Sequence, residues 1–251
     1  MIVVDKLIKT FGGVRAVQEV SFAIPAGSVY SVIGPNGAGK TTLFNLISGI
    51  YTPTSGSIRF NDKEVAGERP DVLARMGMSR TFQNLQVCLN MSALDNVMVG
   101  AHLQFNTSFL AAMFRLPGIR RADASSREYC ASLMEFVGVG KYVNSHANAM
   151  SYGALKRLEI ARALAARPRI LFLDEPAAGL NHTETHEIEV LIRKIADSGV
   201  TVVLVEHDMK MVMNISDRIL VLDYGKKLAE GTATEVRANP DVIAAYLGAA
   251  A

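Results

Sequence analysis

A glycine-rich stretch with one lysine and two threonines is the clearest candidate for chemistry in this 251-residue chain. Residues 34–42 have the sequence Gly-Pro-Asn-Gly-Ala-Gly-Lys-Thr-Thr and match the phosphate-binding loop, G-x-x-x-x-G-K-[ST]. Glycines let the backbone fold around phosphates with successive N–H groups pointing inward. Lys40 is placed to reach the β- and γ-phosphates, and the Thr41 hydroxyl to hold Mg²⁺. The stretch predicts a nucleoside triphosphate site formed by Gly34, Asn36, Gly37, Gly39, Lys40, Thr41 and Thr42.

The sequence on either side of this loop supplies the strand and the helix that the motif requires. An apolar run at 29–33 precedes the loop, and a run with helical character at 42–50 follows it. The positive end of such a helix points at the bound anion. This context favours a phosphate site over a glycine-rich turn that binds nothing.

Carboxylates and a histidine follow two runs that are typical of central parallel strands. The runs at 169–174 and 200–205 are almost entirely β-branched or apolar, as expected for strands buried on both faces. Ligands of open α/β sheets bind at the carboxyl ends of the strands. We therefore expect Asp174 to hold Mg²⁺ and Glu175 to orient or deprotonate an attacking water. His207 lies after the second run, where an imidazole could hydrogen-bond the γ-phosphate.

The segment 150–164, which contains Ser151, predicts a short Ser/Gly loop that opens a long amphipathic helix. A serine hydroxyl, exposed N–H groups and a helix N-terminus together form an anion site. The chain thus has two anion-binding helix starts but only one phosphate-loop lysine, Lys40. A two-fold dimer resolves this, because each serine loop can then face the nucleotide of the other subunit. A plain N-capped helix is the alternative for this segment taken alone.

Composition and charge narrow the class of protein. The chain is 49% hydrophobic and 20% charged, which fits a globular fold with a sizeable core. Its net charge of +2 implies no strong attraction to nucleic acid, so we expect no such partner. No apolar run is long enough to span a bilayer, and the first residues lack the layout of a signal peptide, so we expect a cytoplasmic chain. Cys88 and Cys130 fit a reducing compartment and lack metal-ligand spacing.

The order of the predicted elements indicates an α/β fold of the P-loop NTPase type. A helical run at 184–198 joins the two buried strands, which implies a right-handed parallel crossover. The middle of the chain has few β-branched runs and several helix-like segments, which predicts an inserted helical subdomain. We further expect antiparallel strands at 2–7, 14–24 and 57–60, helices at 93–100 and 122–137, a hairpin over 219–230 and a helix capped by Asn239 over 241–247.

With these motifs in place, the whole chain resembles the ATP-binding domain of ABC transporters. The resemblance implies one domain, with a nucleotide-binding core of mixed and parallel strands at 1–84 and 155–251 and a helical subdomain at 85–154. It implies that the loop binds ATP with Mg²⁺, that Glu175 is catalytic and that His207 is the switch histidine. It assigns further roles to Gln83, which would link Mg²⁺ and water to a membrane partner, to Ser151 and Gly153 in the signature loop, and to Phe11, which would stack on adenine.

The departures from the general pattern indicate a subfamily. The usual signature is Leu-Ser-Gly-Gly-Gln, whereas this chain has Met150, Tyr152 and Ala154 in place of the leucine, the first glycine and the glutamine. Tyr152 and Asn181 resemble the ATP-binding subunits of importers for branched-chain amino acids. The segments 11–17 and 230–248 resemble that group too. Ala154 departs even from the subfamily, which puts a polar contact near the signature loop in doubt.

The resemblance implies an ATPase on the cytoplasmic face of the inner membrane. Its partners would be membrane permeases, a second ATP-binding subunit, identical or a related paralogue, and indirectly a periplasmic solute-binding protein. Related systems carry urea, amides or aromatic acids or extract lipopolysaccharide, and these stay open as alternatives. A kinase or nucleotide switch, or a soluble ABC protein acting on DNA or ribosomes, is less consistent with the motifs. The segment 109–121 mixes large apolar residues with three arginines, which fits either a docking surface or the core of the helical part.

Overall fold

The computed structural model describes residues 1–104 and 117–248 of the chain. Two compact units are present: a sheet unit, Met1–Arg80 with Arg169–Ala251, and a helical unit, Thr81–Pro168. Most of the segment 109–121 lies outside the described residues. We expected the helical part to span 85–154, whereas the helix after Ser151 lies wholly within the helical unit of the structure.

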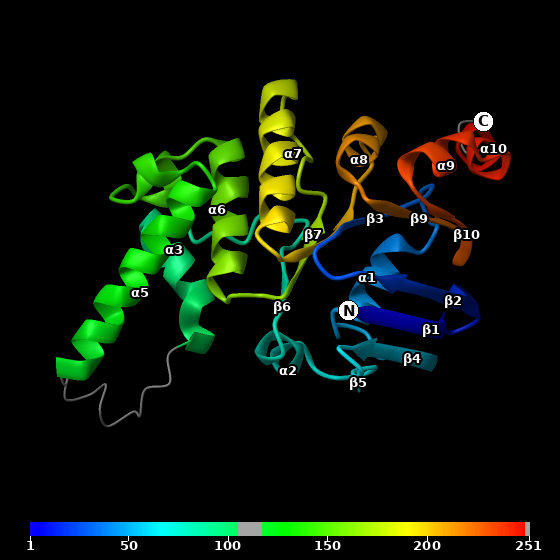
Figure 1. Cartoon of the computed structure of the whole chain (residues 1–251), viewed down its shortest axis with the longest axis horizontal. Coiled ribbons are helices and arrows are strands. Elements are labelled where there is room, and N and C mark those ends of the chain that lie inside the picture. The colour runs from blue at the N-terminus through cyan, green and yellow to red at the C-terminus, as the bar shows by residue number, and fades with distance from the viewer. Residues whose placement is uncertain (105–116, 249–251) are drawn as a thin grey trace. The chain divides into compact units, whose positions relative to one another are not determined.

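A six-stranded sheet, mostly parallel, forms the centre of the sheet unit (Figure 1). The strands lie in the order β10-β9-β3-β8-β7-β6, and only the pair β9 and β10 is antiparallel. Every residue of β3, β7 and β8 is buried, as their continuous apolar sequences predicted. The bounds are β3 Val29–Ile33, β6 Met78–Arg80, β7 Ile170–Asp174, β8 Thr201–Val205, β9 Arg218–Asp223 and β10 Lys226–Gly231.

A second, antiparallel sheet is built from the N-terminal part of the chain and confirms the predicted layer. Its order is β2-β1-β4-β5. β1 pairs with β2 and with β4, and each pairing contains register shifts. The strands are β1 Ile2–Phe11, β2 Val14–Ile24, β4 Ser55–Phe60 and β5 Lys63–Glu64.

The hydrophobic core of the sheet unit lies between these two sheets and includes helix α1, Lys40–Ile47 (Figure 1). Phe44 of α1 meets Phe172 of β7 edge to face, with ring centroids 5.3 Å apart. Burying one such side chain stabilises the fold by about 1.5–3 kcal/mol. The helix that follows the phosphate loop is therefore anchored by its apolar face, and its N-terminus is left at the end of β3.

Five further helices complete the sheet unit, and their caps follow from the sequence. Asn181 and Glu184 form a capping box at the start of α7. Asn239 accepts hydrogen bonds from the N–H groups of Asp241 and Val242, so the predicted C-terminal cap is confirmed. The helices are α2 Pro70–Arg75, α7 His182–Asp197, α8 Met209–Ile215, α9 Ala233–Ala238 and α10 Pro240–Gly248.

The helical unit contains the segments predicted to be helical in the middle of the chain. α3, Ala93–Gly100, has the expected bounds and is capped by Ser92, which accepts from the Asp95 N–H at 3.0 Å. It packs against α6, Tyr152–Ala165, and α5, Pro117–Phe136. The described part also has short helices η1 Ala101–Gln104, η2 Gly140–Tyr142 and η3 Ala147–Ala149. Among the helices of the described residues, none combines the length and hydropathy needed to cross a membrane.

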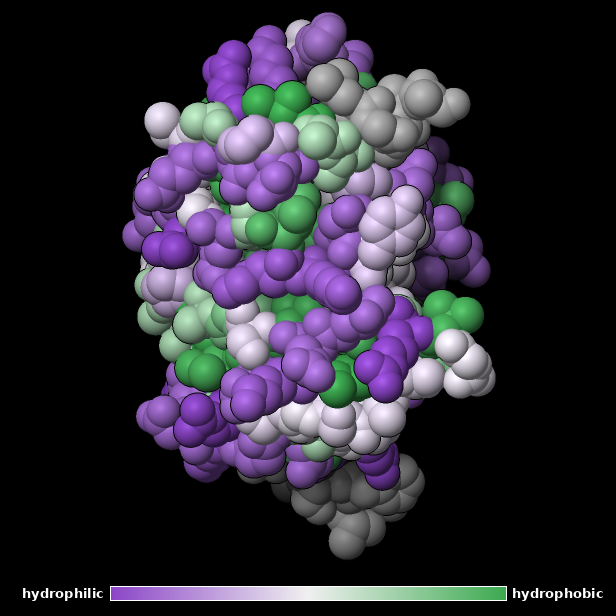
Figure 2. All heavy atoms as spheres, turned by 90° about the vertical axis from the view of Figure 1, so that its right-hand side faces the viewer, coloured by the Kyte–Doolittle hydropathy of each residue, from purple (hydrophilic) through white to green (hydrophobic). Residues whose placement is uncertain are grey.

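Figure 2 shows the face of the molecule on the side of β10 and the C-terminal helices. Hydrophilic residues dominate this face, and its hydrophobic residues lie in separate small groups. Large continuous apolar patches are what mark docking surfaces. The described residues on this face do not form one.

Candidate functional site

Three loops that follow neighbouring strands bring the predicted chemistry to one edge of the sheet. β3, β8 and β7 are adjacent, and all three run parallel. The phosphate loop follows β3, Glu175 follows β7, and His207 lies just beyond the end of β8. The carboxyl edge of the sheet therefore carries the phosphate loop, the predicted carboxylate and the predicted imidazole together.

The phosphate loop forms a hollow of about 260 Å³ lined by Ala16, residues 36–42 and His207. Two of its positions require glycine, because another part of the backbone lies too close to leave room for a Cβ atom. A Cβ on Gly34 would lie 2.1 Å from the Leu222 carbonyl oxygen, and one on Gly39 would lie 2.4 Å from that of Ala16. Both glycines also have positive φ, which L side chains rarely adopt. The hollow thus has the backbone geometry of an anion cradle at the start of α1.

Lys40 is held inside this loop. Its ammonium donates to the carbonyl oxygens of Gly34 at 2.8 Å and Pro35 at 2.9 Å, and the residue is only 6% exposed. Burial lowers the pKa of the Lys40 ammonium, and the nearby negative charge of Glu175 opposes that change. The loop therefore holds the Lys40 ammonium at the hollow.

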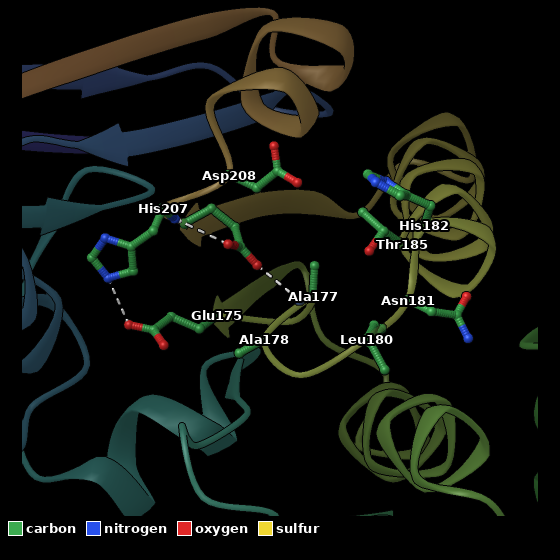
Figure 3. A pocket seen from close by; sticks show the side chains of 10 residues that line it. Glu175, Ala177, Ala178, Leu180, Asn181, His182, Thr185, His207 and Asp208 are labelled. Carbon is green, nitrogen blue, oxygen red and sulfur yellow. Dashed lines mark hydrogen bonds and ion pairs between the residues drawn. The ribbon is translucent and has the colours of Figure 1, made fainter.

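Glu175 adopts an unusual backbone conformation and contacts His207. Its φ is +49°, a left-handed value that is strained for a residue other than glycine. The Glu175 N–H donates to the Val205 carbonyl at 3.0 Å, which fixes the end of β7 to the end of β8. Glu175 Oε1 lies 2.8 Å from His207 Nε2, and Figure 3 shows the two side chains pointing toward one another. The predicted carboxylate and imidazole are thus one hydrogen-bonded pair.

Asp174 lies at the end of β7 with a fixed partner. Its Oδ2 accepts from the Arg80 guanidinium at 2.8 Å, and Arg80 also donates to Asn45 Oδ1 at 2.7 Å and Ser48 Oγ at 2.6 Å. The Asp174 carboxylate and the Thr41 hydroxyl offer hard oxygen donors, which Mg²⁺ prefers. The donor set therefore fits Mg²⁺, with Arg80 setting the orientation of the carboxylate.

Phe11 lies at the end of β1 and is 43% exposed. Tyr51 meets its ring edge to face with centroids 5.4 Å apart, and the Lys9 ammonium lies 4.9 Å from the ring centroid. These contacts orient an exposed aromatic ring, as a stacking platform for a base would require. The role of Phe11 on adenine stays a prediction.

The remaining predicted site residues belong to the helical unit. Ser151 is the exposed N-cap of α6 and accepts from the Ala154 N–H at 3.4 Å. Gly153 is buried in the first turn, and Ala154, at the place of the usual glutamine, is 7% exposed. Gln83 is exposed in the irregular segment that opens the helical unit. Their parts in the site stay predictions.

Comparison with known protein families decides the class of this site. A family model described as ABC transporter matches residues 17–178, which is more than half of the chain. The chain belongs to the ABC transporter family. A second model, described as branched-chain amino acid ATP-binding cassette transporter, matches residues 226–251 of the cassette. The family predicted from the phosphate loop and the signature segment is therefore confirmed.

Relatives that match over nearly their whole length show to which subfamily the cassette belongs. It is 48% identical over 248 residues to BraF of Pseudomonas aeruginosa, a high-affinity branched-chain amino acid transport ATP-binding protein. That match covers 98% of this chain and 97% of the relative. The cassette is thus an ATP-binding protein of the branched-chain amino acid transport subfamily, as the residues Tyr152 and Asn181 indicated.

Solved structures confirm the fold. An ATP-binding cassette of an ABC transporter in its ADP conformation has a TM-score of 0.86 at 29% identity, over 99% of this chain and 98% of that one. A dimeric cassette in a post-hydrolysis state, bound to ADP and phosphate, has a TM-score of 0.74 at 26% identity, over 93% and 99%. The cassette therefore shares its fold with nucleotide-bound relatives, one of which is a dimer.

Two charged residues of the cassette contact predicted site residues and were missed in the sequence. Arg80 lies on β6, a three-residue strand too short to show a periodic pattern. Glu206 directly follows β8 and is 4% exposed. The signal in the sequence was its position, because Glu206 lies directly between the buried strand and His207. A glutamate is rarely buried without a partner, so this position indicated a paired carboxylate beside the site.

Proposed function

We propose that this cassette hydrolyses ATP to power the uptake of branched-chain or related amino acids through a membrane ABC importer. One observation carries the hydrolytic part: the Glu175–His207 pair lies at the sheet edge that carries the phosphate loop, and His207 lines the hollow of that loop. The similarity to BraF along nearly the whole of both chains supports the amino acid as cargo.

The phosphate loop would hold the triphosphate through its N–H groups and Lys40, with Phe11 against the adenine. Thr41 and Asp174 would hold Mg²⁺, and the resemblance to the family assigns Gln83 a part in binding the ion as well. When bound, the cation neutralises charge that develops on the phosphate oxygens. Arg80 keeps the Asp174 carboxylate in one orientation, because its guanidinium is fixed by Asn45 and Ser48.

Glu175 would act on the attacking water. Its carboxylate can accept the water proton or orient the water in line with the γ-phosphate. His207 Nε2 lies 2.8 Å from Glu175 Oε1 and so fixes the orientation of that carboxylate. The pair would therefore supply both orientation of the water and a proton acceptor.

The active form would be a pair of cassettes, identical or paralogous. Ser151 and Gly153 of one cassette would close over the triphosphate held by the other, with the helix dipole of α6 aimed at it. The dimeric relative supports this arrangement. The pair would sit on permease subunits at the cytoplasmic face of the membrane, served by a periplasmic solute-binding protein.

An uptake experiment tests the proposed function. In cells that lack this chain, we expect slower uptake of labelled leucine, isoleucine and valine, and recovery when the wild-type chain is restored. Uptake of glutamate serves as the control, because an acidic side chain is a different cargo. Normal uptake of all three amino acids in the depleted cells would contradict the cargo. A purified wild-type chain without ATPase activity, alone and with its permeases, would contradict the hydrolytic function.

Replacing Ser151 by arginine should block closure of the dimer and spare nucleotide binding within one cassette. The bulky cation would occupy the exposed cap at the start of α6, where the γ-phosphate of the other cassette is expected. Size-exclusion chromatography with Mg-ATP and an ATP titration measure the two properties separately. Ser92→Arg is the matched control, since Ser92 caps α3 of the same unit. Wild-type ATPase activity in Ser151→Arg would show that the loop has no role across subunits.

A further inference from the structure

Glu206 is a buried carboxylate that joins the two loops of the hydrolytic pair. The residue is 4% exposed and directly follows β8. Its Oε1 accepts the N–H of Ala177 at 2.8 Å, and its Oε2 accepts the N–H of His207 at 3.0 Å. Dashed lines in Figure 3 mark both bonds, which run to the loop after β7 and to the loop after β8. One side chain thus bridges the segments that carry Glu175 and His207.

The loop that Glu206 holds is the strained one. Glu175 has a φ of +49°, and strain of this kind persists only where surrounding contacts fix it. Three hydrogen bonds do so here: Glu175 N–H to the Val205 carbonyl, Ala178 N–H to the Glu175 carbonyl, and Ala177 N–H to Glu206. Only the last of these three involves a side chain. Glu206 is therefore a position where a mutation can loosen this turn without altering the backbone of either strand.

Glu206 is costly to bury, which argues against a role in packing alone. Burial raises the pKa of the Glu206 carboxyl, the negative charge of Glu175 acts in the same direction, and backbone N–H groups of Ala177, His207 and Asp208 oppose the rise. A buried charge costs folding free energy unless it is fully hydrogen-bonded. Here the bonds go to backbone groups on both sides of the catalytic pair, so the gain is a fixed geometry at that pair.

We propose that Glu206 is a positioning residue for ATP hydrolysis, which keeps Glu175 and His207 within hydrogen-bonding distance by bridging the backbones that carry them. This inference rests on the proposed function, because it concerns the same hydrolytic pair. Glu206 acts through Glu175 and His207, because its carboxylate accepts from the N–H groups of Ala177 and His207, which lie outside the phosphate loop. Loss of Glu206 should therefore lower the rate of hydrolysis and leave nucleotide affinity unchanged.

Glu206→Gln is the first test, because glutamine has nearly the same shape. Its amide keeps one oxygen for a backbone N–H but places an NH₂ group against the other, which breaks one of the two bridges. We expect kcat to fall about 10- to 100-fold, the range that follows from misplacing a catalytic group by about 1 Å. The Kd for ATP should stay within about twofold of wild type, since an effect confined to the transition state does not alter ground-state binding. Glu206→Asp keeps the charge but is too short to span both loops, so it should lower kcat as well.

The control is Glu235→Gln, which removes a carboxylate that also accepts a backbone N–H, from Thr232 at 2.7 Å, in the exposed cap of α9. Its kcat should match wild type. A double variant distinguishes a positioning role from a purely structural one.

In a Glu175→Gln background, Glu206→Gln should cause little further loss of hydrolysis rate, because the carboxylate that Glu206 positions is already gone. A purely structural residue would instead lower the rate by the same factor in both backgrounds.

Three results overturn the inference. The first is a wild-type kcat in both Glu206→Gln and Glu206→Asp. The second is a parallel loss of ATP affinity, kcat and melting temperature, which would indicate general destabilisation. The third is a loss of hydrolysis rate from Glu206→Gln that is as large in the Glu175→Gln background as in the wild type. A wild-type chain that hydrolyses ATP separates these failures from failure of the proposed function, which would instead show as no hydrolysis in the wild type itself.

Discussion

Glu175→Gln is expected to bind ATP normally and to hydrolyse it about 10²- to 10⁴-fold more slowly, the range contributed by a positioned proton acceptor. Glutamine keeps the size of the side chain and can still contact His207, so the hollow of the phosphate loop should not change. What is lost is the carboxylate that we propose as the acceptor of the water proton. With hydrolysis nearly stopped, ATP should hold two cassettes together for long periods.

Three measurements check this expectation: the steady-state ATPase rate, the Kd of ATP, and the elution volume of the protein at saturating Mg-ATP. Glu184→Gln is the matched control, because Glu184 belongs to the capping box of α7 and lines no part of the phosphate hollow. We expect the control to hydrolyse ATP at the wild-type rate. A Glu175→Gln protein that stays monomeric with Mg-ATP, or that keeps its hydrolysis rate, would contradict the assigned role.

The central strands could be predicted almost to the residue, because strands that are buried on both faces have apolar and β-branched sequences. The run 200–205 became β8 Thr201–Val205, and 169–174 became β7 Ile170–Asp174. Strands buried on both faces consist mostly of apolar and β-branched residues, so both runs are nearly continuous. β2 was also predicted with its correct bounds.

Shorter elements could not be predicted, because they are set by tertiary contacts. β6 has three residues and exists because Met78, Ser79 and Arg80 pair with β7. Its importance lies in Arg80, which binds the Asp174 carboxylate. No periodicity of three residues distinguishes such a strand from a loop.

In the candidate site, too, the residues of the motifs could be predicted from the sequence, whereas the contacts between them could not. The phosphate loop, Asp174, Glu175 and His207 are recognisable because their order relative to apolar strands restricts where they can lie. The left-handed backbone of Glu175 and the bridge made by Glu206 depend on how two loops meet in space. Sequence alone marks which groups gather at the sheet edge, while the contacts that hold them there appear only in the fold.

Lys40→Ala is expected to weaken ATP binding by about 10- to 100-fold, which corresponds to the loss of about 1.5–3 kcal/mol for a hydrogen bond with a charged group. Lys40 is the cation that the loop holds at its hollow, through the carbonyl groups of Gly34 and Pro35. Alanine leaves the backbone N–H groups in place, so residual binding through the loop and Phe11 should persist. The side chain that meets the terminal phosphates would be absent.

Titration calorimetry with ATP and with ADP measures this effect and its origin. Because Lys40 is assigned to the β- and γ-phosphates, the loss of affinity should be larger for ATP than for ADP. Lys63→Ala, at an exposed lysine of β5 in the same unit, is the control and should bind both nucleotides as the wild type does. An unchanged Kd for ATP in a folded Lys40→Ala protein would remove Lys40 from the phosphate site. An equal loss for the two nucleotides would restrict its contact to the phosphates they share, so the comparison locates the ammonium along the triphosphate chain.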